Sequence, residues 1–209
     1  MIRTKICGIT QLDDALCAID CGACALGFNF YEKSQRYIEP KKAESIIKKV
    51  PPFVSLVGLF VNEQTEIIKR IVSQTGVDTI QLHGDESTDI CQELEKLKII
   101  KAFRIKSESD LTQLKKYNVM AYLLDSYHPK LYGGTGIPFE WNFLDGLNIS
   151  KPIIIAGGLK PENIDVLLNA IVPYGIDVCS GVEISPGIKD HKLMKLLFDK
   201  INNIQNQRK

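Results

Sequence analysis

Residues 152–183 read PIIIAGGLKPENIDVLLNAIVPYGIDVCSGVE, and this stretch contains two apolar segments that each end in a glycine loop. The first segment, 152–156, leads into Gly157-Gly158, and the second, 176–179, leads into Ser180-Gly181. Between them Pro161 stands where the first position of a helix is expected. A strand, a loop, a helix and a second strand make the repeating unit of a protein with a parallel sheet.

The same unit recurs along the whole chain. Apolar, strand-like segments follow one another about every 25 residues, which is the length of a strand and a helix with their loops. Several are apolar at consecutive positions, as strands covered on both faces are. Eight such segments predict either a closed (β/α)8 TIM barrel or an open, doubly wound sheet. The segments are 2–7, 25–30, 53–60, 78–82, 99–105, 119–125, 152–156 and 176–179.

Helix signals lie between the expected strands. Thr10 followed by Asp13 resembles a capping box, and Pro40 stands at an expected first helical position. Asn62 and Asp190 are expected to cap two further helices. The weakest helical patterns are those of 107–116 and 140–147.

Size and composition limit the classes of function. The chain has 209 residues, with 26 basic and 25 acidic side chains and a net charge of +1, so no charge excess points to nucleic acid or to a membrane surface. We expect a single catalytic domain over 1–209, a monomer rather than a homodimer, and a cytoplasmic location with free thiols. No signal peptide or apolar membrane span is apparent.

Polar and glycine residues follow almost every expected strand. Cys7, His83, Asp125 and the two glycine loops all come directly at or after a strand end. In a barrel these ends form one rim, and the rim carries the active site. The loops after the seventh and eighth strands form the usual phosphate site of such barrels, and glycines let backbone N–H groups approach the anion. The phosphate-binding candidates are Gly157, Gly158, Ser180, Gly181 and Val182.

Two rim residues can move protons. A Cys7 thiolate can take a proton from carbon, and a protonated Asp125 can give one to oxygen. Each has an ordinary alternative, because a cysteine is often a small buried apolar residue and an aspartate is often a cap. Arg36 lies in the long loop after the second strand, where it could hold a carboxylate through two parallel hydrogen bonds, or simply be solvated.

Metal chemistry is not expected. Cys17, Cys21 and Cys24 have the C-x3-C-x2-C spacing of an iron–sulfur loop, but the first two fall on an expected helix, which cannot wrap a cluster. We expect these cysteines to lie in the core or at an interface. No two of the three histidines have metal-ligand spacing.

Taken together, these motifs resemble the phosphoribosylanthranilate isomerase family of tryptophan biosynthesis from end to end. The matching stretches are Lys5-Ile6-Cys7-Gly8-Ile9-Thr10, Ala25-Leu26-Gly27-Phe28-Asn29-Phe30 with Ser34 and Arg36-Tyr37-Ile38, Gly58-Leu59-Phe60-Val61-Asn62, Gln81-Leu82-His83-Gly84-Asp85-Glu86, Leu124-Asp125, Gly133-Gly134-Thr135-Gly136, Ala156-Gly157-Gly158-Leu159, and 177–187. Two departures stand out: Gln35 replaces a frequent proline, and Cys179 replaces a frequent serine.

The resemblance implies an Amadori rearrangement of N-(5′-phosphoribosyl)anthranilate inside a TIM barrel, with no cofactor and no metal. It implies that Cys7 is the general base, that Asp125 is the general acid and that Arg36 holds the anthranilate carboxylate. His83 and Asp177 match positions near the substrate, in supporting roles. Two alternatives remain: another sugar-phosphate isomerase or lyase, which would keep the glycine loops without the Cys7, Arg36 and Asp125 set, and a phosphate-binding module without catalysis.

Overall fold

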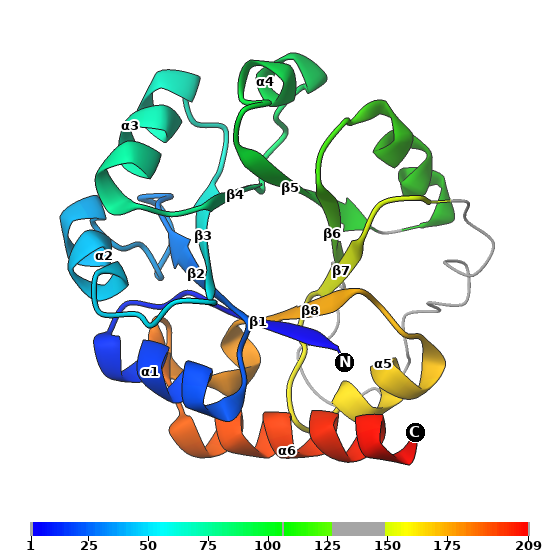
Figure 1. The fold of residues 1–209 in the computed structure, drawn as a ribbon. Helices are drawn as coiled ribbons and strands as arrows, with labels where there is room; N and C mark the ends of the chain where they lie inside the picture. Colours follow the sequence, from blue (N-terminus) through cyan, green and yellow to red (C-terminus); the bar gives the residue numbers. More distant parts are fainter. Residues whose placement is uncertain (1, 106, 127–148, 209) are drawn as a thin grey trace.

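The computed structural model describes residues 2–105, 107–126 and 149–208, and its strands form one closed parallel barrel in the order β1 to β8. Figure 1 looks along the barrel, with helices arranged around the ring of strands. The strands are β1 (Arg3–Cys7), β2 (Ala25–Asn29), β3 (Ser55–Phe60), β4 (Thr79–Leu82), β5 (Lys98–Ile105), β6 (Ala121–Ser126), β7 (Ile153–Ala156) and β8 (Gly175–Val178). All eight predicted strands are confirmed, and closure removes the open-sheet alternative.

Helices follow most of the strands. They are α1 (Leu12–Cys21), α2 (Pro40–Ile47), α3 (Thr65–Thr75), α4 (Thr88–Glu93), α5 (Ile164–Ala170) and α6 (His191–Gln207), with the 3-10 helices η1 (Glu108–Lys116) and η3 (Ser180–Val182). A short antiparallel hairpin of β9 (Glu183–Ser185) and β10 (Ile188–Lys189) follows η3. The expected motif at 133–136 and the expected helix at 140–147 lie outside the described residues.

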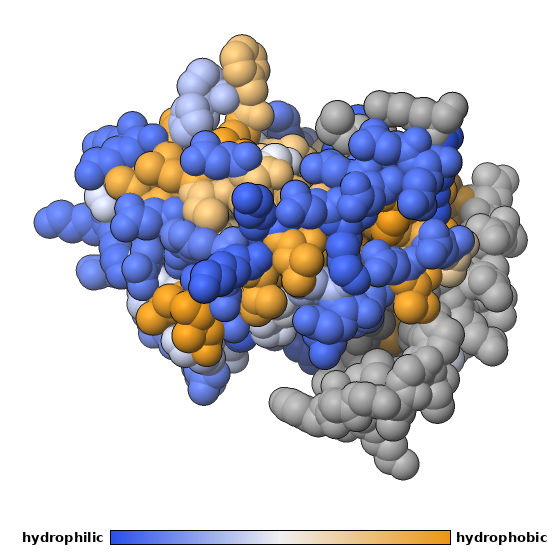
Figure 2. Space-filling view, turned by 90° about the horizontal axis from the view of Figure 1, so that it is seen from below, coloured by the Kyte–Doolittle hydropathy of each residue, from blue (hydrophilic) through white to orange (hydrophobic). Residues whose placement is uncertain are grey.

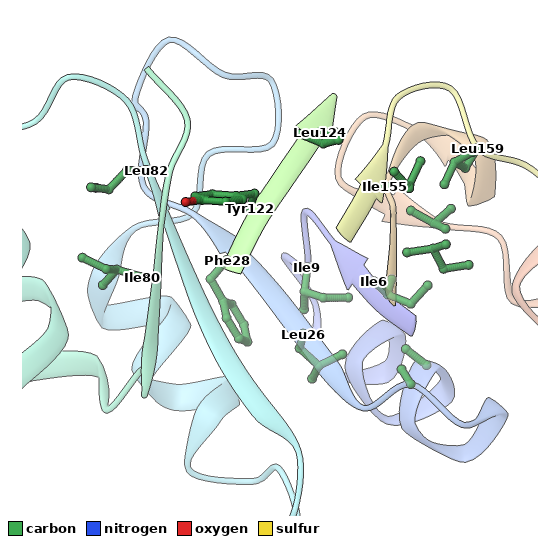
Figure 3. Close-up of a cluster of buried hydrophobic side chains, with 14 of the residues drawn as sticks. Ile6, Ile9, Leu26, Phe28, Ile80, Leu82, Tyr122, Leu124, Ile155 and Leu159 are labelled. Atoms are coloured by element: carbon green, nitrogen blue, oxygen red, sulfur yellow. The ribbon is translucent and has the colours of Figure 1, made fainter. Parts of the chain in front are cut away.

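The strands bury side chains on both faces, as their consecutive apolar residues predict. The larger core cluster lies between the strands and the helices, and Figure 3 shows part of it. A smaller cluster comes from the opposite face of the strands, inside the barrel, and includes Val57, Ile100, Leu123 and Ile154. Successive side chains of a strand point alternately to these two faces, so only every second residue of a strand points into the barrel. The labelled residues of Figure 3 are Ile6, Ile9, Leu26, Phe28, Ile80, Leu82, Tyr122, Leu124, Ile155 and Leu159.

The predicted helix starts are partly right. Pro40 begins α2, and Asp190 caps α6 by accepting hydrogen bonds from the backbone N–H groups of Lys192 and Leu193. Thr10 does not cap α1, because its hydroxyl donates to the carbonyl of Gly187 in the β9–β10 hairpin instead.

The predictions for Asn62 and Pro161 are also wrong. The Asn62 side chain accepts a hydrogen bond from the Asp85 N–H in the loop after β4, and α3 begins three residues after Asn62. Pro161 lies in a turn, and α5 begins at Ile164. At Asn62 a contact with another loop takes the side chain that the local pattern assigned to a helix start, whereas Pro161 lies in a turn that Asn163 holds through hydrogen bonds to Gly158 and Lys160.

The outer surface mixes polar and apolar residues. On the face seen in Figure 2, hydrophobic residues form separate patches between hydrophilic ones. Among the described residues, no helix has the length and apolar character needed to cross a membrane.

Candidate active site

The carboxyl ends of the strands bring the predicted rim residues together. Cys7 ends β1, His83 directly follows β4 and Asp125 lies near the end of β6. Asp177 lies in β8, which pairs with β1 and closes the ring. The expectation that Cys7 and Asp125 share one end of a closed barrel is therefore confirmed.

A buried ion pair lies beneath Cys7. Lys5, two residues before Cys7 on β1, places its Nζ 2.8 Å from Asp177 Oδ2, and both side chains are almost fully buried. Burial raises the pKa of Asp177 to about 6 although Lys5 acts in the opposite direction. Burial alone would lower the pKa of Lys5, but the Asp177 carboxylate and Cys7 raise it above its ordinary value. Lys5 therefore stays a cation beside the Cys7 thiol.

Cys7 has a thiol that ionises easily. Its pKa lies well below the ordinary value of a thiol because Cys179 donates a hydrogen bond to its sulfur. Burial opposes this effect, whereas the positive charges of Lys5 and Lys189 reinforce it. The same hydrogen bond raises the pKa of Cys179 well above the ordinary value. The contacts and charges therefore favour the thiolate at Cys7 over the thiolate at Cys179.

A chain of three side chains leads to Asp125. The Gln81 side-chain amide donates to Nδ1 of His83 over 2.8 Å, which leaves the ring proton on Nε2. His83 Nε2 then donates to Asp125 Oδ2 over 3.2 Å. Gln81 is fully buried, and its Oε1 has no hydrogen-bond partner among the described residues. The position of the Asp125 carboxyl is thus fixed from inside the barrel.

Arg36 meets an acid that the sequence patterns did not point to. Its Nε lies 3.0 Å from both carboxylate oxygens of Glu183, and its Nη2 lies 2.7 Å from Oε2. Lys189 Nζ, fully buried, lies 2.8 Å from Oε1 of the same carboxylate. Burial raises the pKa of Glu183, but these hydrogen bonds and charges outweigh it and keep the pKa below its usual value. None of the described residues accepts from Nη1 of Arg36, so this edge of the guanidinium stays open to a ligand.

The two glycine loops lie against each other. Gly157 and Gly158 both have positive φ, at 97° and 61°, and a side chain on Gly158 would meet no atom within 4 Å. A Cβ on Gly181 would overlap the carbonyl of Leu159, so only glycine allows the loop after β8 to approach the loop after β7. Asn163 holds the first loop by donating to the Gly158 carbonyl and accepting from the Lys160 N–H, each over 2.9 Å.

The three cysteines with cluster-like spacing lie away from this rim. Cys17 and Cys21 are on α1, as predicted, and line a groove between α1 and α6. Cys24 is exposed and donates to the Thr4 carbonyl. In the described part of the chain no three Cys, His, Asp or Glu side chains are grouped so that they could hold a metal ion.

Comparison with known proteins identifies the family of this chain. The sequence model of N-(5′-phosphoribosyl)anthranilate (PRA) isomerase matches residues 4–200. The chain belongs to this family.

The relatives of this family extend over nearly the whole chain. The N-(5′-phosphoribosyl)anthranilate isomerase of Geotalea uraniireducens is 47% identical over 190 residues, which are 91% of this chain and 93% of that protein. The enzyme of Citrifermentans bemidjiense is 46% identical over 98% of each chain. The crystal structure of the Thermotoga maritima enzyme is 40% identical, covers 99% of this chain and all of that chain, and has a TM-score of 0.88.

A further solved structure contains a ligand. It is a phosphoribosyl anthranilate isomerase in complex with reduced 1-(o-carboxyphenylamino)-1-deoxyribulose 5-phosphate, 37% identical, covering 97% of this chain and all of that chain, with a TM-score of 0.88. A thiamine phosphate pyrophosphorylase of Pyrococcus furiosus, only 14% identical, shares the fold alone.

The search for strand ends missed three residues of the rim, Lys5, Gln81 and Glu183. Lys5 and Gln81 stand two positions before Cys7 and His83. Residues two apart in a strand point to the same face of the sheet. A residue found at the end of a strand therefore also indicates that the residue two positions before it points into the barrel, below the rim. Glu183 had no comparable signal, because its partner Arg36 lies 147 residues away in sequence.

Proposed function

We propose that Cys7 and Asp125 carry out the family's reaction as general base and general acid. As a member of the family, the chain is an isomerase of tryptophan biosynthesis that converts N-(5′-phosphoribosyl)anthranilate to 1-(2-carboxyphenylamino)-1-deoxyribulose 5-phosphate. The single observation that best supports the roles is that Cys7 and Asp125 lie at the same rim of one closed barrel, with the buried Lys5–Asp177 pair beneath the thiol. No cofactor enters the proposed steps.

The first step opens the furanose ring of the substrate. Opening requires a proton on the ring oxygen, and Asp125 is the proposed donor. The electron pair of the anomeric nitrogen then forms a C=N bond as the ring C–O bond breaks. The result is a Schiff base with a positive nitrogen.

The second step moves a proton from carbon. The positive nitrogen acidifies the C–H at the ribosyl carbon next to the former anomeric centre, and the Cys7 thiolate removes that proton. The electron pair neutralises the nitrogen and gives an enolamine, which relaxes to the ketone. Lys5 supports this step because its charge helps to keep Cys7 ionised before the substrate arrives.

Gln81 and His83 explain how Asp125 could carry a proton. In the observed arrangement His83 donates to Asp125, so Oδ2 acts as an acceptor. Rotating the Gln81 amide by half a turn exchanges its donor and acceptor, so that Nδ1–H of His83 donates to Oε1 and Nε2 accepts from a protonated Asp125. Either orientation makes one hydrogen bond to His83 and leaves one buried amide atom unpaired among the described residues. Glutamine can therefore serve both protonation states, as a positioning residue.

Two further contacts orient the substrate in this proposal. The open Nη1 edge of Arg36 would bind the anthranilate carboxylate, while Glu183 fixes the opposite edge of the guanidinium. The backbone at Gly157, Gly158, Ser180, Gly181 and Val182 would bind the phosphate. Asp177 would act through Lys5, whose ammonium group it holds beside Cys7.

Turnover of freshly prepared N-(5′-phosphoribosyl)anthranilate tests the roles directly. Cys7→Ser should block proton abstraction because a hydroxyl is rarely ionised at neutral pH, and Asp125→Asn should block ring opening. Each change should lower kcat by roughly two to four powers of ten. Gln81→Met, which can neither donate nor accept, should lower kcat by a smaller factor and leave KM nearly unchanged. A correctly folded Cys7→Ser protein with near-full kcat would exclude the thiolate mechanism and leave Asp177 as the next candidate base.

We also propose that residues 1–209 act as one catalytic domain, because all the proposed site residues come from one barrel, and that the protein is a monomer. A relative from Thermotoga maritima is described as dimeric, so the oligomeric state varies within the family. The mass of the protein in solution tests this part of the proposal.

A further inference from the structure

Two thiols face each other at the catalytic rim. In the pairing of β1 with β8, Lys5 lies opposite Asp177 and Ile6 lies opposite Val178, so Cys7 and Cys179 come next in register. Lys5 and Asp177 touch each other inside the barrel. Cys7 ends β1 and Cys179 directly follows β8, one position nearer the rim than the ion pair. The two thiols interact there, which lowers the pKa of Cys7 and raises that of Cys179.

The spacing of the two residues suits a disulfide. Neighbouring strands lie about 4.7–4.9 Å apart, within the roughly 4.4–6.8 Å between Cα atoms that disulfides span. Glycines on either side leave room for the sulfurs. A Cβ on Gly27 would lie 2.8 Å from the Cys7 sulfur, and one on Gly8 would lie 3.1 Å from the Cys179 sulfur. A bond between these sulfurs would therefore join the end of β1 to the residue that directly follows β8.

The charges around the pair assign different tasks to the two sulfurs. Lys5 lies beside Cys7, and its charge favours the thiolate, which is the nucleophilic form. The pKa of Cys179 is raised well above its ordinary value, chiefly by its hydrogen bond with Cys7, and Glu183 Oε1, 3.8 Å from its sulfur, is a second acceptor for the thiol proton. Lys189 Nζ lies 3.9 Å from the Cys179 sulfur and would favour its ionisation once the charge on Cys7 is gone.

We propose that Cys7 and Cys179 form a reversible oxidative modification site, in which a hydroperoxide oxidises Cys7 and Cys179 closes a disulfide. In the first step the Cys7 thiolate attacks a peroxide oxygen and the O–O bond breaks. Cys7 becomes a sulfenic acid, and hydroxide, or alkoxide from an organic hydroperoxide, leaves with the electron pair. In the second step the Cys179 sulfur attacks the Cys7 sulfur, the S–O bond breaks, and the departing hydroxide takes the Cys179 proton to form water.

The disulfide would remove the proposed base from the reaction, and a thiol reductant would restore it. The pair depends on Cys179, because a serine at this position could not close a disulfide. Bond formation does not require that Cys7 be the general base, whereas the loss of activity does. The two proposals can therefore fail separately.

Peptide mapping after peroxide treatment tests the site. A Cys17→Ser/Cys21→Ser variant is the matched background, since those two neighbouring thiols of α1 could form a second disulfide far from the rim. After treatment with hydrogen peroxide and alkylation of the remaining thiols, we expect a cross-linked peptide that contains Cys7 and Cys179. Activity relative to the untreated protein should fall in proportion to the cross-linked fraction and return with dithiothreitol.

Cys179→Ser in the same background separates the linked pair from simple oxidation of Cys7. Here Cys7 should be trapped by dimedone as a sulfenic acid and then proceed to the sulfinic acid, so that dithiothreitol no longer restores activity. The proposal is overturned if full inactivation occurs without the cross-linked peptide, or if Cys179→Ser recovers as completely as its background. A cross-linked protein that keeps full activity would support the modification site and refute Cys7 as the base.

Discussion

In the proposed reaction the guanidinium of Arg36 binds two carboxylates, that of Glu183 and that of the substrate. Glu183 already takes Nε and Nη2, so a substrate carboxylate must bind the remaining Nη1 edge. The Glu183 pair fixes the plane of the guanidinium before the substrate arrives, which reduces the entropy lost on binding. Lys189 supplies a second cation to Glu183, so this carboxylate stays paired when Arg36 also binds the substrate.

Replacing Arg36 with Met should weaken binding of the natural substrate. Loss of a hydrogen bond to a charged group costs about 1.5–3 kcal/mol, which is roughly 10- to 150-fold in KM or in the Kd of a product analogue. The matched control is the phosphoribosyl derivative of aniline, which lacks the carboxylate and should be indifferent to the substitution. Equal losses for the two substrates would show that Arg36 acts on the fold of its loop and not on the carboxylate.

The residues of the site differ in how far the sequence predicts them. Cys7, His83 and Asp125 could be found because each follows an apolar strand, and barrel geometry gathers strand ends. Lys5 and Gln81 lie inside strands. A single polar residue among apolar ones in a strand is not in itself a sign of a functional site. The contact of Arg36 with Glu183 joins loops from distant parts of the chain, and no local pattern records it.

At the scale of the elements, the loop after β4 depends on a buried ion pair. Lys101 on β5 places its Nζ 3.0 Å from Glu86 Oε2, and both side chains are almost fully buried. Lys101 also donates to the Gly84 carbonyl, while Glu86 accepts from the backbone N–H groups of Asn62 and Gly84. This network holds the loop that begins at His83.

Lys101→Met should therefore destabilise the protein strongly, because Glu86 would remain buried without its cation. Breaking a buried pair in this way costs about 3–5 kcal/mol. Lys69→Met is the matched control: its pair with Glu93 is half exposed, and such pairs contribute about 0–1 kcal/mol. Urea denaturation of both variants measures the difference. Similar free energies of unfolding for the two would mean that Glu86 finds water or another partner when Lys101 is lost.

The glycine loops make a second prediction for an element. Gly181→Ala should push the loop after β8 away from Leu159 and Lys160, whose Cβ would lie 2.7 Å from the new methyl group, and so raise KM for the phosphorylated substrate. Gly76→Ala is the control. It imposes a side chain on a positive φ of 77° at the end of α3, far from the rim, where the nearest atom is 4.0 Å away. It should reduce stability with KM unchanged. If inorganic phosphate binds to the Gly181→Ala protein as tightly as before, the phosphate assignment is wrong.

At the scale of the molecule, the alternation of strands and helices predicts an α/β fold but not its closure. Closure requires β1 to pair with β8, and the ion pair that joins them links residues 172 positions apart. Nothing in the local pattern distinguishes this pairing from the free edges of an open sheet. The misplaced cap at Thr10 has the same origin, since its hydroxyl binds Gly187 in a loop that closure brings near. Asn62 instead binds the loop after the neighbouring strand β4, a tertiary contact that the local pattern does not record either.

The last prediction concerns whether one chain suffices for activity. Phe53 is fully exposed in the loop between α2 and β3, with a positive φ of 72°. This loop enters β3 from its amino end, so Phe53 lies at the end of the barrel opposite the proposed site. A second copy that covered Phe53 would bury an aromatic ring without touching the rim that holds Cys7 and Asp125.

The rate per chain should therefore stay constant as the enzyme is diluted. It should also be unchanged in Phe53→Asn, which removes the exposed ring and tolerates a left-handed backbone better. Light scattering should give a mass near 23.4 kDa for both proteins. A mass of twice this value would refute the monomer and leave the single-chain site intact, because that site is tested by the rate alone. A rate per chain that falls on dilution would show instead that the rim needs a neighbouring subunit to hold its shape.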